Sequence, residues 1–161
     1  AGRYYRGADF QTGARFLSDN AGDFFVNLSI AYVDDERRSD TPGDPYVTIM
    51  EQERRLRSRS YLSFSWTKND WAAGVSTSRI GSMNFQSPRW DGKPNTKIDP
   101  YYDIGAFVRY DIEDGHYIAL SVSNLMDDIP KKNSDLGWPW FAQYYYSPVG
   151  RELFLTYRYT F

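Results

Sequence analysis

The stretch FFVNLSIAYV, residues 24–33, alternates apolar and small or polar side chains with a period of two. In an extended chain one face would carry Phe24, Val26, Leu28, Ile30 and Tyr32. The other face would carry Asn27, Ser29 and Ala31. Successive side chains of a β-strand point to opposite faces, so this stretch predicts a strand. No stretch of comparable length has helical spacing, and the sequence therefore predicts an all-β fold.

The same alternation recurs along the chain and predicts strands at about 7–18, 24–36, 54–68, 71–84, 100–112, 116–125 and 150–161. Short connections rich in Asn, Asp and Gly (SDNAGD, KND, EDG) alternate with long ones at 37–53, 85–99 and 126–149 that carry most of the prolines. Outer-membrane barrels have short periplasmic turns and long extracellular loops. The connections therefore favour a transmembrane antiparallel up-and-down β-barrel over a soluble sandwich.

Composition agrees with this interpretation. The 161 residues are 18% aromatic, yet their mean hydropathy is -0.65, as expected when apolar and polar residues alternate. The net charge of -2 gives no indication of nucleic-acid binding, and the absence of cysteine excludes disulfides and thiolate metal sites. The first residues, AGRYYRGADF, lack an apolar signal-peptide core, so any signal peptide would lie outside this sequence.

The number of predicted strands also has a consequence. Bacterial single-chain barrels have an even number of strands with both ends in the periplasm. Seven strands that begin on the extracellular side do not close in that way, and open edges are not tolerated in lipid. We therefore interpret residues 1–161 as the C-terminal part of a larger outer-membrane barrel.

The last third of the chain resembles a known family. The segments NLMDDIPKKN (124–133) and YYYSPVGRELFLTYRYTF (144–161) are similar to the C-terminal end of TonB-dependent outer-membrane receptors. The matching positions are Asn124, Leu125, Asp127, Tyr146, Pro148, Gly150, Arg151, Tyr159 and Phe161, whereas Met126 replaces the usual aromatic residue. YRGADFQTGARF and AYVDDE also look like hairpin segments of that family.

The resemblance implies the last seven strands of a barrel of about 22 strands, filled by a plug domain that this chain lacks together with the TonB box. It implies a transporter in the bacterial outer membrane, not an enzyme, that binds and imports a scarce nutrient, most often a ferric siderophore. The implied partners are the rest of the barrel and its plug, the TonB complex, lipopolysaccharide and membrane lipid, and the barrel-assembly machinery, which would bind the terminal Phe161. No cofactor is implied.

Three arginines are the first candidate ligand-binding residues. If Leu62, Phe64 and Trp66 face lipid, strand alternation places Arg55, Arg57 and Arg59 in the lumen, about 7 Å apart. Guanidinium groups suit carboxylate and phosphate partners, so these side chains would form an electropositive wall for an anionic ligand. The favoured structural alternative is that they pair with acidic residues of the plug or of neighbouring strands.

Aromatic residues of the long connections are the second candidates. Trp138, Trp140 and Phe141 lie in GWPWFAQYYYSP, and Tyr46 and Trp90 lie in the other two long connections. Their flat faces suit stacking on sugars or aromatic ligands. The alternative is an aromatic girdle at the membrane interface or the packed interior of a loop.

Catalytic and metal sites have little support in the sequence. The acidic groups Asp34–Glu36 and Asp127–Asp128 lack the spacing of a calcium loop, so solvated charge or lipopolysaccharide bridged by divalent ions is expected. The single histidine, His116, falls in a short turn, where an exposed role is expected. Two alternative functions remain: a passive porin or translocator barrel, and a soluble carbohydrate-binding β-sandwich.

Overall fold

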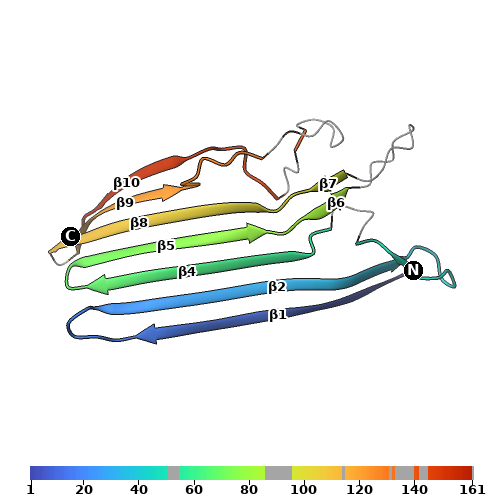
Figure 1. The fold of residues 1–161 in the computed structure, drawn as a ribbon, viewed down its shortest axis with the longest axis horizontal. Coiled ribbons are helices and arrows are strands. Elements are labelled where there is room, and N and C mark those ends of the chain that lie inside the picture. The colour runs from blue at the N-terminus through green and yellow to red at the C-terminus, as the bar shows by residue number, and fades with distance from the viewer. Residues whose placement is uncertain are drawn as a thin grey trace.

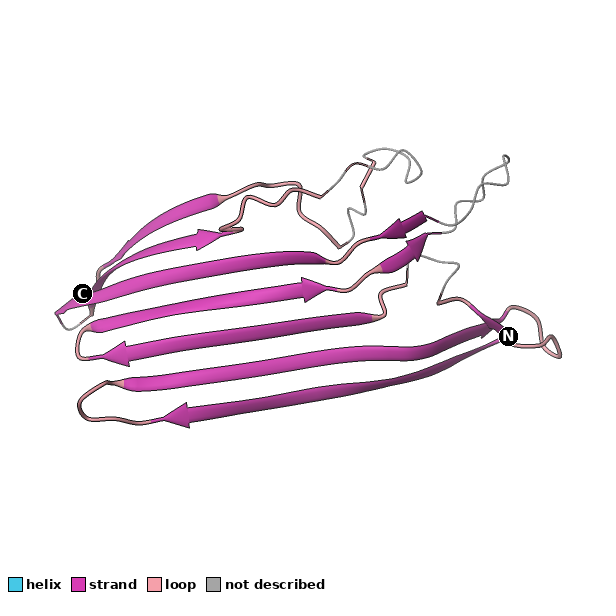
Figure 2. Ribbon diagram, viewed as in Figure 1, coloured by secondary structure: helices cyan, strands magenta, loops and turns pink. Residues whose placement is uncertain are grey.

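One large antiparallel sheet dominates the computed structural model, which describes residues 1–50, 55–85, 96–113, 115–130, 132, 140–141 and 145–160. The seven long strands are β1 (Gly2–Phe16), β2 (Asp23–Ser39), β4 (Ser58–Lys68), β5 (Trp71–Ile80), β8 (Tyr101–Glu113), β9 (His116–Ser123) and β10 (Glu152–Arg158). They lie side by side in that order (Figure 1). The described residues contain no helix (Figure 2), which confirms the all-β prediction.

Three short strands lie in or beside the long connections. β3 (Val47–Thr48) pairs with the end of β2, and β6 (Met83–Phe85) pairs with β7 (Thr96–Ile98) in a separate two-stranded sheet. Several strand bounds predicted from the sequence were wrong. The first strand begins at Gly2 rather than residue 7, β4 begins at Ser58 rather than residue 54, and the predicted strand 71–84 is divided into β5 and β6.

The connections alternate as the sequence predicts. Short turns join β1 to β2, β4 to β5 and β8 to β9 at one end of the sheet, and the long connections lie at the other end (Figure 1). Gly22, Asn69 and Gly115 have φ angles of 90°, 49° and 83°, a region that only glycine, and to a lesser degree asparagine, adopts without strain. The Asn, Asp and Gly content of these short segments thus makes the tight turns.

The sheet is open. Within the described residues β1 pairs only with β2, and β10 pairs only with β9. A closed barrel is therefore not seen, and the sheet has two edges whose backbone groups can accept further strands. The structure confirms an up-and-down antiparallel sheet.

Register across the sheet separates an apolar face from a polar face. At the centre of the apolar face one continuous row crosses all seven strands: Ala14, Val26, Phe64, Val75, Ala106, Val122 and Leu153. Aromatic side chains dominate this face near the short turns: Phe16, Phe24, Trp66, Trp71, Tyr110, Tyr157 and Tyr159. The opposite face is rich in serine: Ser29, Ser63, Ser65, Ser76, Ser78, Ser121 and Ser123.

Among the described residues, the buried apolar side chains lie outside the seven long strands. They are Ile49, Met50, Met83 and Tyr146, all at the end of the sheet that carries the long connections. Met83 and Tyr146 form a small cluster, and burial raises the pKa of Tyr146 to about 12. Because no apolar side chain of the seven strands is itself buried, the sheet has no hydrophobic core of its own.

Asn124 fastens the chain where β9 ends. Its side chain is 5% exposed, donates from Nδ2 to the carbonyl oxygens of Asp128 (2.8 Å) and Val149 (3.3 Å), and accepts from the Asp128 amide (2.9 Å). Its own amide donates to Asp103 Oδ1 of β8 at 3.1 Å. One residue therefore joins β8, the end of β9 and the segment that leads into β10.

Gly150 completes this attachment. Asp127 Oδ1 accepts from the Arg151 amide at 2.8 Å, and a Cβ on Gly150 would lie 2.5 Å from that same carboxylate oxygen. Only glycine leaves room for the carboxylate to reach the backbone of the last strand. The NLMDD and VGRE motifs thus have a direct structural role in placing β10.

We predict that Asn124→Ala destabilises the protein by about 1–3 kcal/mol, because the two carbonyl groups and the Asp128 amide lose buried hydrogen bonds. Asn20→Ala, in an exposed turn, is the control and should change the free energy of unfolding by less than about 0.5 kcal/mol. Urea unfolding of the intact protein measures both values. Equal effects of the two substitutions would contradict the role of Asn124.

Candidate functional site

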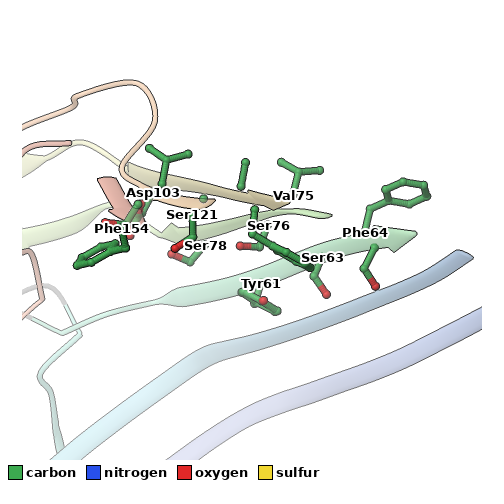
Figure 3. A pocket seen from close by; sticks show the side chains of 15 residues that line it. Tyr61, Ser63, Phe64, Val75, Ser76, Ser78, Asp103, Ser121 and Phe154 are labelled. Carbon is green, nitrogen blue, oxygen red and sulfur yellow. The ribbon is translucent and has the colours of Figure 1, made fainter. Parts of the chain in front are cut away.

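A hollow of about 590 Å³ lies on the polar face of the sheet (Figure 3). Serines of the three strands β4, β5 and β9 line it: Ser63, Ser65, Ser76, Ser78, Ser121 and Ser123. Tyr61, Asp103, Phe107 and Phe154 add a phenol, one carboxylate and two phenyl rings. The hollow therefore combines many hydroxyl groups with flat apolar surfaces and a single negative charge.

Two glycines of the polar face leave room for side chains at this hollow. In register, Gly74 of β5 stands between Ser65 and Phe107, and a Cβ there would lie 2.5 Å from the Phe107 ring. Gly105 is opposite Ser76 and leaves the neighbouring position free. Phe107 and Phe154 are both in register with Ser121, so they flank it on the two strands next to β9. Both phenylalanines line the hollow.

The predicted arginines do not all lie on the strand that alternation suggested. Arg59 belongs to β4, shares the polar face with Tyr61 and is exposed. Arg55 and Arg57 precede β4, so their directions do not follow from strand parity. Arg57 remains beside β2, because its carbonyl oxygen accepts from the Val33 amide at 2.8 Å. Within the described residues, no carboxylate lies within ion-pair distance of Arg57 or Arg59.

Glu36 is the centre of an ionic group at this end of the sheet. Its side chain is 7% exposed and accepts a hydrogen bond from Arg3 Nε at 2.6 Å. Arg55 Nε lies 3.6 Å from the other carboxylate oxygen. The carboxylate thus connects β1 to the segment before β4. Arg55 contributes to this connection, which favours a structural role for its side chain over ligand binding.

The acidic run of β2 is neutralised by arginines from nearby positions. Asp34 pairs with Arg6, and Asp35 pairs with Arg37 at 2.7 Å. In the described part of the chain no group of three or more acidic or histidine side chains could hold a metal ion. Ion pairing among side chains, rather than a cation site, accounts for these carboxylates.

The aromatic candidates occupy two regions. Tyr46 is 52% exposed, and its hydroxyl group lies against Gly2 at the start of β1. Trp140 is 44% exposed, whereas Phe141 packs against the Met83–Tyr146 cluster. Leu56, between the two arginines Arg55 and Arg57, packs against the same cluster. Trp90 and Trp138 lie outside the described residues.

His116 has a structural environment in the turn region. Its Nδ1 lies 3.3 Å from the Tyr157 hydroxyl, and its ring meets the Tyr159 ring edge-on at a centroid distance of 4.1 Å. His116 therefore belongs to the aromatic residues at the short-turn end. Within the described residues, His116 makes no hydrogen bond to a hydroxyl group that lines the hollow.

The sequence did not reveal the serine-lined hollow or the Glu36 group. Alternation indicated that the serines share a face, but the size and position of the hollow depend on Gly74 and Gly105 meeting residues of other strands. Glu36 is 33 residues from Arg3, and no local pattern links them. The signal that could have found the hollow is the recurrence of Ser or Gly at every second residue in the predicted strands 54–68, 71–84 and 116–125.

No protein-family model matches the chain, and no curated protein matches it significantly. None of the described segments is a helix of the length and apolarity needed to span a membrane.

We predict that Glu36→Ala destabilises the protein by about 2–4 kcal/mol, because it removes a buried carboxylate that pairs with Arg3 and lies 3.6 Å from Arg55 Nε. Asp40→Ala is the matched control: Asp40 also pairs with an arginine, Arg38, but its side chain is 74% exposed, so a loss below about 1 kcal/mol is expected. Chemical denaturation of the intact protein gives both values. A loss at Glu36 no larger than at Asp40 would refute the bridging role.

Proposed function

We propose that this chain forms part of the wall of an outer-membrane β-barrel that imports a nutrient, as in TonB-dependent transporters, and acts in the bacterial outer membrane. The observation that carries the proposal is the two-sided sheet. Its apolar face is widely exposed, whereas its opposite face carries serines, charged residues and the hollow. Such a sheet fits a barrel whose outer surface faces lipid and whose inner surface faces a polar lumen.

The exposed apolar side chains support a lipid-facing surface. Leu153 and Leu155 are 69% and 73% exposed, and Leu62, Val75 and Leu120 are between 43% and 49% exposed. Soluble monomeric proteins rarely expose a contiguous apolar surface of this extent. The aromatic residues at the short-turn end, including a Trp71–Tyr110 pair with centroids 4.7 Å apart, are of the kind found at membrane interfaces.

The two open edges support closure by further strands. Unpaired backbone groups are not tolerated at the edge of a sheet in lipid. In the proposed barrel β1 and β10 therefore pair with strands that this chain does not supply. The phenyl rings of Phe107 and Phe154 would then face a plug domain or a ligand in the lumen. Phe161, which lies outside the described residues, would be the residue that the assembly machinery recognises.

An anionic nutrient, such as a ferric siderophore, is the proposed ligand. Arg57 and Arg59 lie near the end of the sheet that carries the long connections, and neither has a carboxylate partner in the part of the chain that the structure describes. Guanidinium groups in that position attract and hold carboxylate-bearing ligands. Tyr46 and Trp140 are exposed at the same end and would provide aromatic contacts.

We predict that Leu153→Arg lowers the free energy of unfolding of the intact protein in phosphatidylcholine vesicles by about 2–4 kcal/mol, which is the cost of an arginine near the bilayer midplane. Leu153 is 69% exposed, so little packing within the protein is lost. Thr156→Arg, on the polar face of the same strand, is the control and should have little effect. Urea unfolding in vesicles measures both variants.

The soluble sandwich predicts a different result. An intact protein that remains folded and monomeric in aqueous buffer without detergent would contradict the membrane proposal. A barrel whose complete polypeptide contains no plug segment would instead be a passive porin.

We predict that the double variant Arg57→Ala/Arg59→Ala weakens binding of an anionic ferric siderophore about tenfold or more while membrane assembly is unchanged. Arg15→Ala, whose side chain pairs with Asp23 near the short turns, should bind normally. Titration of the reconstituted protein with ferric enterobactin-type and neutral hydroxamate-type siderophores measures this. Undiminished binding of the anionic ligand would show that these arginines serve only the scaffold.

A further inference from the structure

An arginine of β5, Arg79, interrupts the apolar face of the sheet. Arg79 of β5 is in register with Ser60 of β4 and Tyr102 of β8. It shares its side of β5 with Trp71 and Val75, which belong to the apolar face. Arg79 is the second-last residue of β5 and lies toward the long connections, at the end opposite the aromatic residues of the short turns.

Within the part of the chain that the structure describes, Arg79 contacts neutral groups. Its Nε donates to the Tyr102 hydroxyl at 3.2 Å, and its Nη1 donates to Ser58 Oγ at 3.0 Å. The guanidinium carbon also lies 5.9 Å from the centroid of the Tyr102 ring. No carboxylate of the described residues lies within ion-pair distance of Arg79, whereas Arg6 and Arg37 each have one.

A guanidinium group has five N–H donors, and these two hydrogen bonds use two of them. Because the hydrogen bonds to Tyr102 and Ser58 fix the orientation of the guanidinium group, they also fix the direction of its remaining N–H donors. Ser60, next to Arg79 in the ladder, adds a hydroxyl group. The result is a positively charged polar patch, made of Ser58, Ser60, Arg79 and Tyr102, within an otherwise apolar surface.

We propose that this patch binds the phosphate headgroup of an anionic lipid in the surrounding membrane leaflet. The proposal rests on the membrane location proposed above. Charge complementarity carries it: a positive charge with neutral protein partners, on a lipid-facing surface, needs an anion at the boundary between acyl chains and headgroups. A guanidinium fork with neighbouring hydroxyl groups fits phosphate oxygens, and aromatic residues such as Tyr102 suit that depth.

The position on the outer face distinguishes this patch from the proposed nutrient site. Arg59, which we assign to the lumen, is on the face of β4 opposite to Ser60. The same strand therefore presents one arginine to the lumen, while the neighbouring strand presents Arg79 outward. Binding of lipid at Arg79 would anchor the end of β5 at the membrane surface without blocking the hollow.

The test compares the intact protein in vesicles of phosphatidylcholine with and without phosphatidic acid. We expect phosphatidic acid to raise the equilibrium constant for folding of the wild-type protein about fivefold, through its contact with Arg79. Arg79→Gln should lose most of that gain, and Arg79→Lys, which keeps the charge but not the fork, should keep part of it. Arg109→Gln is the control, because Arg109 is on the polar face and pairs with Asp111 at 2.8 Å.

Each variant is compared with itself in the two vesicles, so a loss of intrinsic stability does not obscure the result. An equal gain for the wild-type protein and Arg79→Gln overturns the lipid site and leaves the barrel proposal intact. An equal Arg79-dependent gain from inorganic phosphate in phosphatidylcholine vesicles overturns the lipid source of the phosphate. Failure of the wild-type protein to insert into either vesicle overturns both proposals.

Discussion

Register is the constraint on which the rest of the structure depends. Each strand pairs with the next in one antiparallel ladder, and a shift of one residue would exchange the two faces of a strand. The row from Ala14 to Leu153 is continuous only because all six pairings keep the same parity. A serine-lined hollow on one face and an exposed apolar surface on the other are both consequences of that parity.

The β1–β2 ladder changes parity near the long connections. Gly7 pairs with Val33, but Arg6 pairs with Asp35, so β2 has one extra residue, Asp34. Bulges of this kind re-aim the side chains that follow. Beyond it Glu36 comes to lie across from Tyr5 and within reach of Arg3, and the alternation of apolar and polar residues gives way to paired charges. The bulge thus separates the regular two-sided sheet from an end held together by ion pairs.

The sequence predicted what depends on local periodicity and missed what depends on distant partners. Strands, faces and short turns follow from neighbouring residues, and so did the place of Arg59 on the polar face. Arg55 and Arg57 were placed by extending the strand beyond its true start at Ser58. The Asn124 attachment links residues up to 25 positions apart, and the partners of Arg79 lie 21 and 23 positions away, so neither could be read from a single stretch.

A sheet with no buried apolar side chains in its long strands needs a further layer, of protein, lipid or solvent, packed against each face. Strand pairing alone leaves residues such as Leu155 and Phe154 exposed on opposite sides of β10, and a single layer of this kind is not stable in water. An apolar environment on one side and a polar or plugged lumen on the other would cover both. The small Met83–Tyr146 cluster lies beyond the ends of the long strands, where that covering would end. The absence of an internal core is thus what the membrane proposal explains best, because for such a sheet lipid takes the place of the second protein layer.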